Sequence, residues 1–280
     1  MAAQAAHAAG MMPGADLLDA TTIRGALPEW PRERLRRLEV HGELDSTSNR
    51  LLAVTDLPPG RFDACLAEFQ SAGRGRRGRR WLAPRASGLC LSVNWTFGEP
   101  PSALGALSLA AGVAVLRALG RLGAAGLALK WPNDIVHEGR KLGGVLIDLR
   151  GEAAGPAYVV VGVGINVRLP AATLAALAAE GTGATDLAAL GTRCSRNELA
   201  AAVITELARM LEEFGARGIA AFADEWRAAD ALANRRVRVL QGGEVLEGLA
   251  RGVDADGALL VEAPGGERRV LSGEVSVRSA

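Results

Sequence analysis

Hydrophobic positions along the chain follow two different periods, and the switches between them predict a succession of strands and helices. Apolar runs over 64–70 and 89–95 are typical of strands, and they flank a loop rich in glycine and arginine. Small and apolar residues over 102–119 predict a helix. The run over 127–131 predicts a further strand that stops at Pro132, because proline restricts the residue before it.

The second half of the chain continues this alternation. β-Branched and apolar residues over 142–149 and 158–167, with glycine and proline between them, predict a paired hairpin that is buried on at least one face. Ser195-Arg-Asn-Glu198 has the capping-box pattern and opens a helix that runs to about Phe214, and 218–229 begins another. We expect the strands to form one mixed central sheet flanked by helices.

Three segments differ in composition and predict the domain organisation. Residues 1–40 are alanine-rich and then arginine-rich, give at most one short helix, and are expected to form a mobile arm. Residues 41–231 hold the predicted sheet and helices, and Asp45-Ser-Thr-Ser-Asn49 is a helix N-cap pattern. Over 232–280, short strands between glycine-containing turns predict a small β-barrel. The expected fold class is therefore α+β.

Composition restricts where the protein works. The chain is 49% hydrophobic and 22% charged, as folded soluble proteins are, and its net charge of +1 gives no global field for nucleic acid or a membrane. Cys65, Cys90 and Cys194 are widely spaced, which fits a reducing compartment and no disulfide framework. No lysine or arginine precedes Arg24, and the longest apolar run, 104–116, is too short to span a bilayer. We expect a cytoplasmic protein.

Lysine usage is the compositional feature that points to chemistry. Of the 32 lysines and arginines only Lys130 and Lys141 are lysine, and both lie in the short region 129–148. Arginine thus serves wherever only a positive charge on a long side chain is needed. At a tight site the compact ammonium of lysine and the planar guanidinium of arginine are not interchangeable. Chance survival is the alternative, but we interpret the two lysines as members of one site.

The densest motif is Gly73-Arg-Gly-Arg-Arg-Gly-Arg-Arg80, followed by Trp81. Its glycines let the backbone approach a ligand, and its five arginines present forks that match phosphate and carboxylate oxygens. The alternative is an RNA-binding basic tract, but such tracts normally lie in disordered tails, whereas this one joins two apolar strands. We therefore favour a nucleotide phosphate, with Trp81 available to stack on a flat base.

Three further motifs point to the same kind of ligand, although the chain has no P-loop and no Rossmann glycine fingerprint. Lys130-Trp-Pro-Asn-Asp134 ends a strand with an ammonium and two polar side chains, where an ordinary Asn-Asp turn is the alternative. Lys141-Leu-Gly-Gly144 puts the second lysine beside glycines. Gly162 and Gly164 lie in a strand, where glycines mark either a ligand on the sheet or a bulge. The convergence of the motifs favours a ligand site.

These motifs, in this order, resemble those of the biotin protein ligases. The resemblance rests on Gly73 to Trp81, Lys130 to Asp134, Arg140 to Gly144 and Gly162-Val-Gly-Ile-Asn166, and it extends to Asp45-Ser-Thr47, Gln70 and Gly273 to Arg278. It covers the chain from about Leu44 to the end. It implies a class II synthetase-like catalytic domain and an SH3-like C-terminal domain. Since few residues precede the match, the resemblance is to the short form that lacks an N-terminal DNA-binding domain.

The resemblance implies ATP-dependent activation of biotin to biotinyl-5'-AMP and transfer of biotin to a lysine of a biotin carboxyl carrier protein, in acetyl-CoA carboxylase or a related carboxylase. A carboxylate is ionised at neutral pH, so activation needs alignment and charge cancellation rather than a general base. ATP with Mg²⁺ and biotin are the implied ligands. We expect no tightly bound cofactor, no nucleic-acid or membrane partner, and a monomer or homodimer.

Site residues are carried over position by position. Lys141 and Arg76 are the implied catalytic residues, and Asp134 is the implied Mg²⁺ ligand. Biotin contacts are implied for Ser46, Thr47, Ser48, Gln70, Gly73, Arg74, Gly75, Arg76, Lys141, Gly144, Gly162 and Gly164. ATP contacts are implied for Arg74, Arg76, Arg77, Trp81, Lys130, Asn133, Asp134, Lys141 and Asn166. Ser48 departs from the asparagine expected in the family, and helix capping is the alternative role for Ser46 and Thr47.

Two other functions fit parts of the pattern. A lipoate or octanoyl ligase is implied to share the fold, but the arginine-glycine loop and the run Lys130 to Asp134 favour biotin. A non-enzymatic nucleic-acid binder would use the arginine loop, which the near-neutral net charge opposes.

Overall fold

The computed structural model describes residues 16–98, 104–151, 155–179, 183–241, 244–271 and 273–277. Its centre is a seven-stranded sheet with the order β1-β2-β3-β7-β6-β5-β4. In that order the strands are β1 (Leu35–His41), β2 (Phe62–Ala67), β3 (Gly88–Phe97), β7 (Ala157–Asn166), β6 (Arg140–Gly151), β5 (Asp134–His137) and β4 (Leu127–Lys130). β1 and β2 pair in parallel, and the other neighbours in this sheet are antiparallel. The predicted mixed sheet is confirmed.

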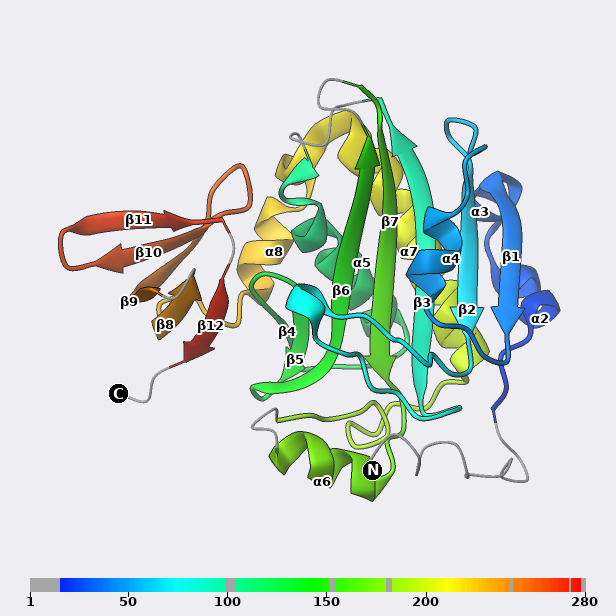
Figure 1. Ribbon diagram of the computed structural model, residues 1–280, viewed down its shortest axis with the longest axis horizontal. Helices are drawn as coiled ribbons and strands as arrows, with labels where there is room; N and C mark the ends of the chain where they lie inside the picture. Colours follow the sequence, from blue (N-terminus) through cyan, green and yellow to red (C-terminus); the bar gives the residue numbers. More distant parts are fainter. Residues whose placement is uncertain are drawn as a thin grey trace.

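Helices cover the two faces of this sheet unequally. α5 (Leu107–Arg121), α7 (Arg196–Arg217) and α8 (Ala223–Ala229) lie on one face, and the short α4 (Thr47–Leu52) lies on the other, while α6 (Ala171–Ala179) lies beyond the strand ends (Figure 1). α7 begins at the predicted capping box. β3 and β7 are buried almost throughout, because both of their faces are covered. None of the described helices is long and apolar enough to cross a membrane.

Residues 16–40 are folded, in contrast to the mobile arm expected for 1–40. They form α2 (Ala20–Ala26), α3 (Glu29–Arg34) and most of the edge strand β1, while 1–15 are outside the described part. Four of their apolar side chains are buried in the main core, namely Leu18, Ile23, Leu27 and Leu35. The prediction is wrong here because the few apolar positions are separated by arginines whose charged ends pair with acidic side chains.

The C-terminal strands form a separate antiparallel sheet with the order β11-β10-β9-β8-β12, which confirms the small β-domain predicted at this end. They are β8 (Arg236–Gln241), β9 (Glu244–Val253), β10 (Leu259–Ala263), β11 (Gly266–Val270) and β12 (Glu274–Val277). The sheet meets the main domain where the Trp131 indole N–H donates to the Gly257 carbonyl at 3.0 Å. Gly257 has a φ of 81°, and a Cβ there would lie 2.9 Å from Ala106, so this approach requires glycine.

A buried ion pair fastens the N-terminal segment to the main domain. Arg196 is 1% exposed at the start of α7, and its Nη1 lies 2.7 Å from Glu68 Oε2, while its Nε donates to the Gly88 carbonyl. The other Glu68 oxygen accepts the backbone N–H of Leu18 at 2.7 Å, and Arg196 Nη1 also donates to the Asp16 carbonyl. Charges removed from water need partners of this kind. Residues 16–19, which precede α2, therefore belong to the folded domain.

Glu68→Ala is expected to lower the free energy of unfolding by about 3–5 kcal/mol, because it leaves the Arg196 guanidinium buried without its anion. Urea denaturation followed by circular dichroism measures the change. The control is Asp224→Ala, which removes an exposed ion pair with Arg227 and should have a much smaller effect. Equal losses in the two variants would contradict the structural role of the buried pair.

Candidate active site

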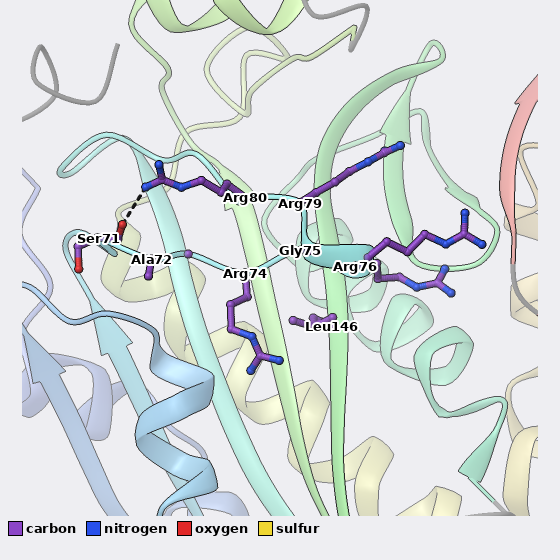
Figure 2. Close-up of a pocket in the computed structure, with 11 residues that line it drawn as sticks. Ser71, Ala72, Arg74, Gly75, Arg76, Arg79, Arg80 and Leu146 are labelled. Atoms are coloured by element: carbon purple, nitrogen blue, oxygen red, sulfur yellow. Dashed lines mark hydrogen bonds between the residues drawn. The ribbon is translucent and has the colours of Figure 1, made fainter. Parts of the chain in front are cut away.

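The arginine-rich loop, residues 73–80, folds back on itself between β2 and β3. The Gly73 carbonyl accepts the Trp81 N–H at 3.0 Å. A Cβ at Gly73 would lie 2.6 Å from the Trp81 carbonyl oxygen, so a side chain does not fit at this crossing. Residues 71–80 and Leu146 of β6 line a cavity of about 830 Å³ (Figure 2). The predicted ligand loop therefore lies over the sheet and borders an open space.

The arginines of this loop point in different directions (Figure 2). The Arg74 guanidinium bonds both carboxylate oxygens of Asp148 on β6, at 2.8 and 3.2 Å, and Asn49 Oδ1 at 3.0 Å. Arg80 donates to the Ser71 carbonyl at 2.8 Å. Arg74, which was predicted to contact ligand anions, is thus neutralised by the carboxylate of Asp148 in this structure. The same ion pair holds the loop against β6.

Arg76 has Arg77 and the carboxylate of Asp134 in its electrostatic surroundings. Its side chain is half-buried, and burial together with the charge of Arg77 lowers the pKa of its guanidinium, whereas Asp134 raises that pKa. Arginine nevertheless stays cationic in proteins. Arg77, the next residue, is exposed. Arg76 therefore supplies a partly desolvated positive charge beside β5.

Lys130, Lys141 and Asp134, which we call the lysine cluster, form the centre of the site. Lys141 Nζ lies 2.6 Å from Asp134 Oδ1 and 5.8 Å from the centre of the Trp81 ring. Lys130 is the register partner of Asp134 across β4 and β5. A Cβ at Gly144 would lie 3.4 Å from Lys141 Nζ. The structure thus places both lysines of the chain at the same end of the sheet.

The backbone of Lys141 is fixed by a segment that sequence analysis did not single out. The Lys141 N–H donates to the Gly183 carbonyl at 2.7 Å, and the Lys141 carbonyl accepts the Thr185 N–H at 3.0 Å. These bonds continue the sheet edge as an isolated parallel bridge. These backbone hydrogen bonds therefore fix the point from which the Lys141 side chain reaches Asp134.

Two asparagines predicted to contact ATP bond to backbone carbonyls. Asn166 is buried, and its Nδ2 donates to the Thr185 carbonyl at 2.9 Å and to the Lys141 carbonyl at 3.4 Å. Asn133 Nδ2 donates to the Val145 carbonyl at 2.6 Å. Both amides hold the turns around the lysine cluster in place.

Trp81 covers Gly164, the second of the two strand glycines. A Cβ at Gly164 would lie 2.4 Å from the Trp81 ring, so only glycine accommodates the indole here. Trp81 Nε1 is buried and makes no geometrically good hydrogen bond among the described residues, and the indole acts on the Cys90 thiol, whose pKa it lowers. Cys90 is the register partner of Gly164, and burial raises the pKa of its thiol to about 11, so it is neutral at pH 7. The ring predicted to contact adenine thus lies on Gly164, one of the glycines predicted to contact biotin.

Thr47, Ser48, Gln70 and Ser92, which we call the polar wall, lie around the start of α4. The Thr47 backbone N–H and hydroxyl both donate to Gln70 Oε1, at 2.8 and 3.2 Å. Ser92 Oγ lies 2.8 Å from Thr47 Oγ1 and 3.1 Å from Ser48 Oγ. Ser46 is the N-cap residue of α4, but its side chain makes no capping bond. Sequence analysis missed Ser92 because a serine within a strand gives no local signal.

A group of possible metal ligands lies outside this site. Three possible ligand atoms, one from each of Glu39, His41 and Cys65, lie within 4.8 Å of one another. Arg50 bonds both oxygens of Glu39, at 2.8 and 3.0 Å, and His41 bonds the same carboxylate at 2.9 Å. Because the guanidinium already neutralises the carboxylate and repels cations, we assign no metal to this group.

Comparison with known proteins agrees with this geometry. Residues 44–166 match the model of the Biotin/lipoate A/B protein ligase family, and 233–278 match that of the Biotin protein ligase C terminal domain. The bifunctional ligase/repressor BirA of Escherichia coli is 37% identical over 278 residues, which cover 94% of this chain and 85% of that protein. The biotin–acetyl-CoA-carboxylase ligase of Mycobacterium tuberculosis is 38% identical over 248 residues, which cover 86% of this chain and 88% of that protein.

A solved structure shares the fold. The biotin protein ligase from Aquifex aeolicus in complex with biotin and ATP matches with a TM-score of 0.70 at 27% identity, covering 88% of this chain and 100% of that one. The arginine loop, the polar wall and the lysine cluster all fall within the family match over 44–166. The chain therefore belongs to the biotin protein ligases, within the Biotin/lipoate A/B protein ligase family.

Proposed function

We propose that this protein activates biotin with ATP to biotinyl-5'-AMP and transfers the biotinyl group to one lysine of a biotin carboxyl carrier protein. The observation that carries the proposal is the order of groups along the sheet. The lysine cluster lies near Gly164, and the polar wall borders Gly162, two residues or about 7 Å farther along β7. Biotin has the same order of groups: a carboxylate, an apolar chain and a ureido ring that needs donors and acceptors.

The first step joins two anions. A biotin carboxylate oxygen attacks the α-phosphorus of ATP, and the bond to the bridging oxygen breaks, which releases pyrophosphate. Because the carboxylate is already ionised at pH 7, the site has no proton to remove; it has to align the groups and cancel their charge. Lys141 and Arg76 supply two cations for this purpose. Lys141 exchanges its contact with Asp134 for the substrate carboxylate.

We assign Mg²⁺ to ATP and to Asp134. Magnesium prefers hard oxygen ligands and usually takes one or two carboxylates together with substrate phosphates, and Asp134 offers such an oxygen beside Lys130. Asp134 loses its ammonium partner when Lys141 turns to the substrate, which leaves its carboxylate available. The ion would contribute charge cancellation on the phosphates.

The second step moves the biotinyl group to an amine. The neutral lysine amine attacks the carbonyl carbon of the mixed anhydride, the bond to the AMP oxygen breaks, and the amine loses a proton. Water would destroy the anhydride before the acceptor arrives, so the site has to stay covered. The arginine loop, strapped to β6 by Arg74 and Asp148, is placed to provide this cover.

The acceptor we propose is the carrier domain of acetyl-CoA carboxylase or a related carboxylase, and the place is the cytoplasm. The name of the Mycobacterium tuberculosis relative supports this acceptor. The three cysteines are free, and burial raises the thiol pKa of each, which suits a reducing compartment.

Lys141→Ala should reduce biotin-dependent pyrophosphate release by about 10²–10³-fold or more, because the ammonium that stabilises the developing charge is lost. The assay measures pyrophosphate from ATP and Mg²⁺ with biotin, lipoate or octanoate supplied in turn, and the wild type should respond to biotin alone. Lys141→Arg keeps the charge but replaces a compact ammonium by a planar fork, so it should recover little activity. Pyrophosphate release with lipoate would change the assignment of the substrate. Full activity of Lys141→Ala would contradict the role of this lysine.

Arg76→Gly should let activated biotin escape before transfer, because the loop loses a partly buried guanidinium within electrostatic range of Asp134. Biotinylation of a bystander protein that lacks a carrier domain, detected with streptavidin, measures the escape. Arg85→Gly is the control, since Arg85 is exposed outside the loop and pairs with Glu43. Bystander labelling no greater than that of the wild type would count against the covering role.

A further inference from the structure

Ser92, a member of the polar wall, has no part in the steps described so far. It lies within β3 and is fully buried. Its register partner on β7 is Gly162, and a Cβ at Gly162 would lie 2.8 Å from Ser48 Oγ and 3.6 Å from Ser92 Oγ. The hydroxyls of both serines therefore border the space that this glycine leaves open.

The direction of each proton in the polar wall follows from one backbone amide. The Thr47 N–H can only donate, so the Gln70 atom that it meets is the carbonyl oxygen Oε1. That oxygen only accepts, so the Thr47 hydroxyl donates to it as well. A hydroxyl has one proton, and Ser92 must therefore donate to Thr47 Oγ1, which leaves Ser48 to donate to Ser92 Oγ. The protons run from Ser48 through Ser92 and Thr47 to Gln70.

This direction gives the two ends of the polar wall opposite character. At the Gln70 end the amide nitrogen carries N–H donors, and the Thr47 backbone fixes that orientation independently of Ser92. At the Ser48 end the hydroxyl proton is used by Ser92, so the lone pairs of Ser48 remain as acceptors. A cyclic urea is complementary, because its carbonyl oxygen accepts and its ring N–H groups donate. The disulfide ring of lipoate has neither group.

We propose that Ser92 is a positioning residue that fixes Ser48 as the acceptor for a ring N–H of biotin. The inference rests on the proposed function, since it takes biotin as the ligand. Ser92 acts from beneath Thr47 and Ser48, without touching the ligand. If its hydroxyl is removed, Ser48 is free to rotate and to point its proton at the ligand N–H, and the acceptor is lost.

The test is isothermal titration of wild type and Ser92→Ala with biotin, with desthiobiotin and with the two cyclic carbamates in which oxygen replaces one ring N–H of desthiobiotin. Affinity for biotin and desthiobiotin should fall together by about 10–100-fold, as expected when buried polar groups lose a partner. The affinity for the carbamate whose ring oxygen faces Ser48 should fall much less, because the freed Ser48 hydroxyl can donate to that ring oxygen. The ratio of the affinities for desthiobiotin and for this carbamate should therefore be smaller in Ser92→Ala than in the wild type. The kcat at saturating biotin should change by less than about threefold.

Two further variants separate positioning from general destabilisation. Thr205→Ala removes a buried hydroxyl that bonds the Ala201 carbonyl within α7, and it should leave all four affinities unchanged. Ser92→Cys keeps a weak donor and acceptor, and its affinities should lie between those of wild type and Ser92→Ala.

The outcomes are distinct. Unchanged biotin affinity in Ser92→Ala, or equal losses for desthiobiotin and for both carbamates, would overturn this inference alone. A wild-type protein that does not bind biotin would overturn the proposed function and this inference with it, and that result appears before any substitution is made.

Discussion

The contact between the Lys141 ammonium and the Asp134 carboxylate, at 2.6 Å, is the interaction around which the site is built. Side chains of this length keep a fixed geometry only if the backbone beneath them is fixed. The antiparallel run of β4, β5 and β6 provides that support, and the segment 183–185 bonds the Lys141 backbone on its N–H and its carbonyl. Asn133 and Asn166 then fasten the surrounding turns. Much of the sheet edge thus serves to present one ammonium.

Steric limits on the sheet complement this electrostatic centre. Gly162 and Gly164 leave space on a strand that is otherwise buried, and the Trp81 ring occupies the space over Gly164. Arg74 and Asp148 hold the loop at the same face. The site is therefore bounded by an aromatic ring, a polar wall and a charged end, with each boundary coming from a different part of the chain.

Features with unusual local chemistry were predictable from the sequence. The two lysines in an arginine-rich chain, the arginine loop and the hairpin strands all lie where the pattern indicated, whereas β1, α2 and α3 were masked by arginine and alanine. β5 is only four residues long, and α6 is mostly alanine, so neither gave a clear period. Ser92 and Asp148 were missed because their partners lie 44 and 74 residues away in sequence. A contact across such a distance has no local signature.

The hydrogen bond from Trp131 to Gly257 has a mechanical consequence. Trp131 precedes the turn that carries Asn133 and Asp134, and Gly257 lies in the turn that connects β9 and β10 of the C-terminal sheet. Because Gly257 is packed against Ala106 without room for a side chain, the small domain cannot slide at this joint without moving the turn or breaking the bond. The two domains are therefore joined next to the lysine-cluster end of the site, through the residue that precedes the turn with Asn133 and Asp134.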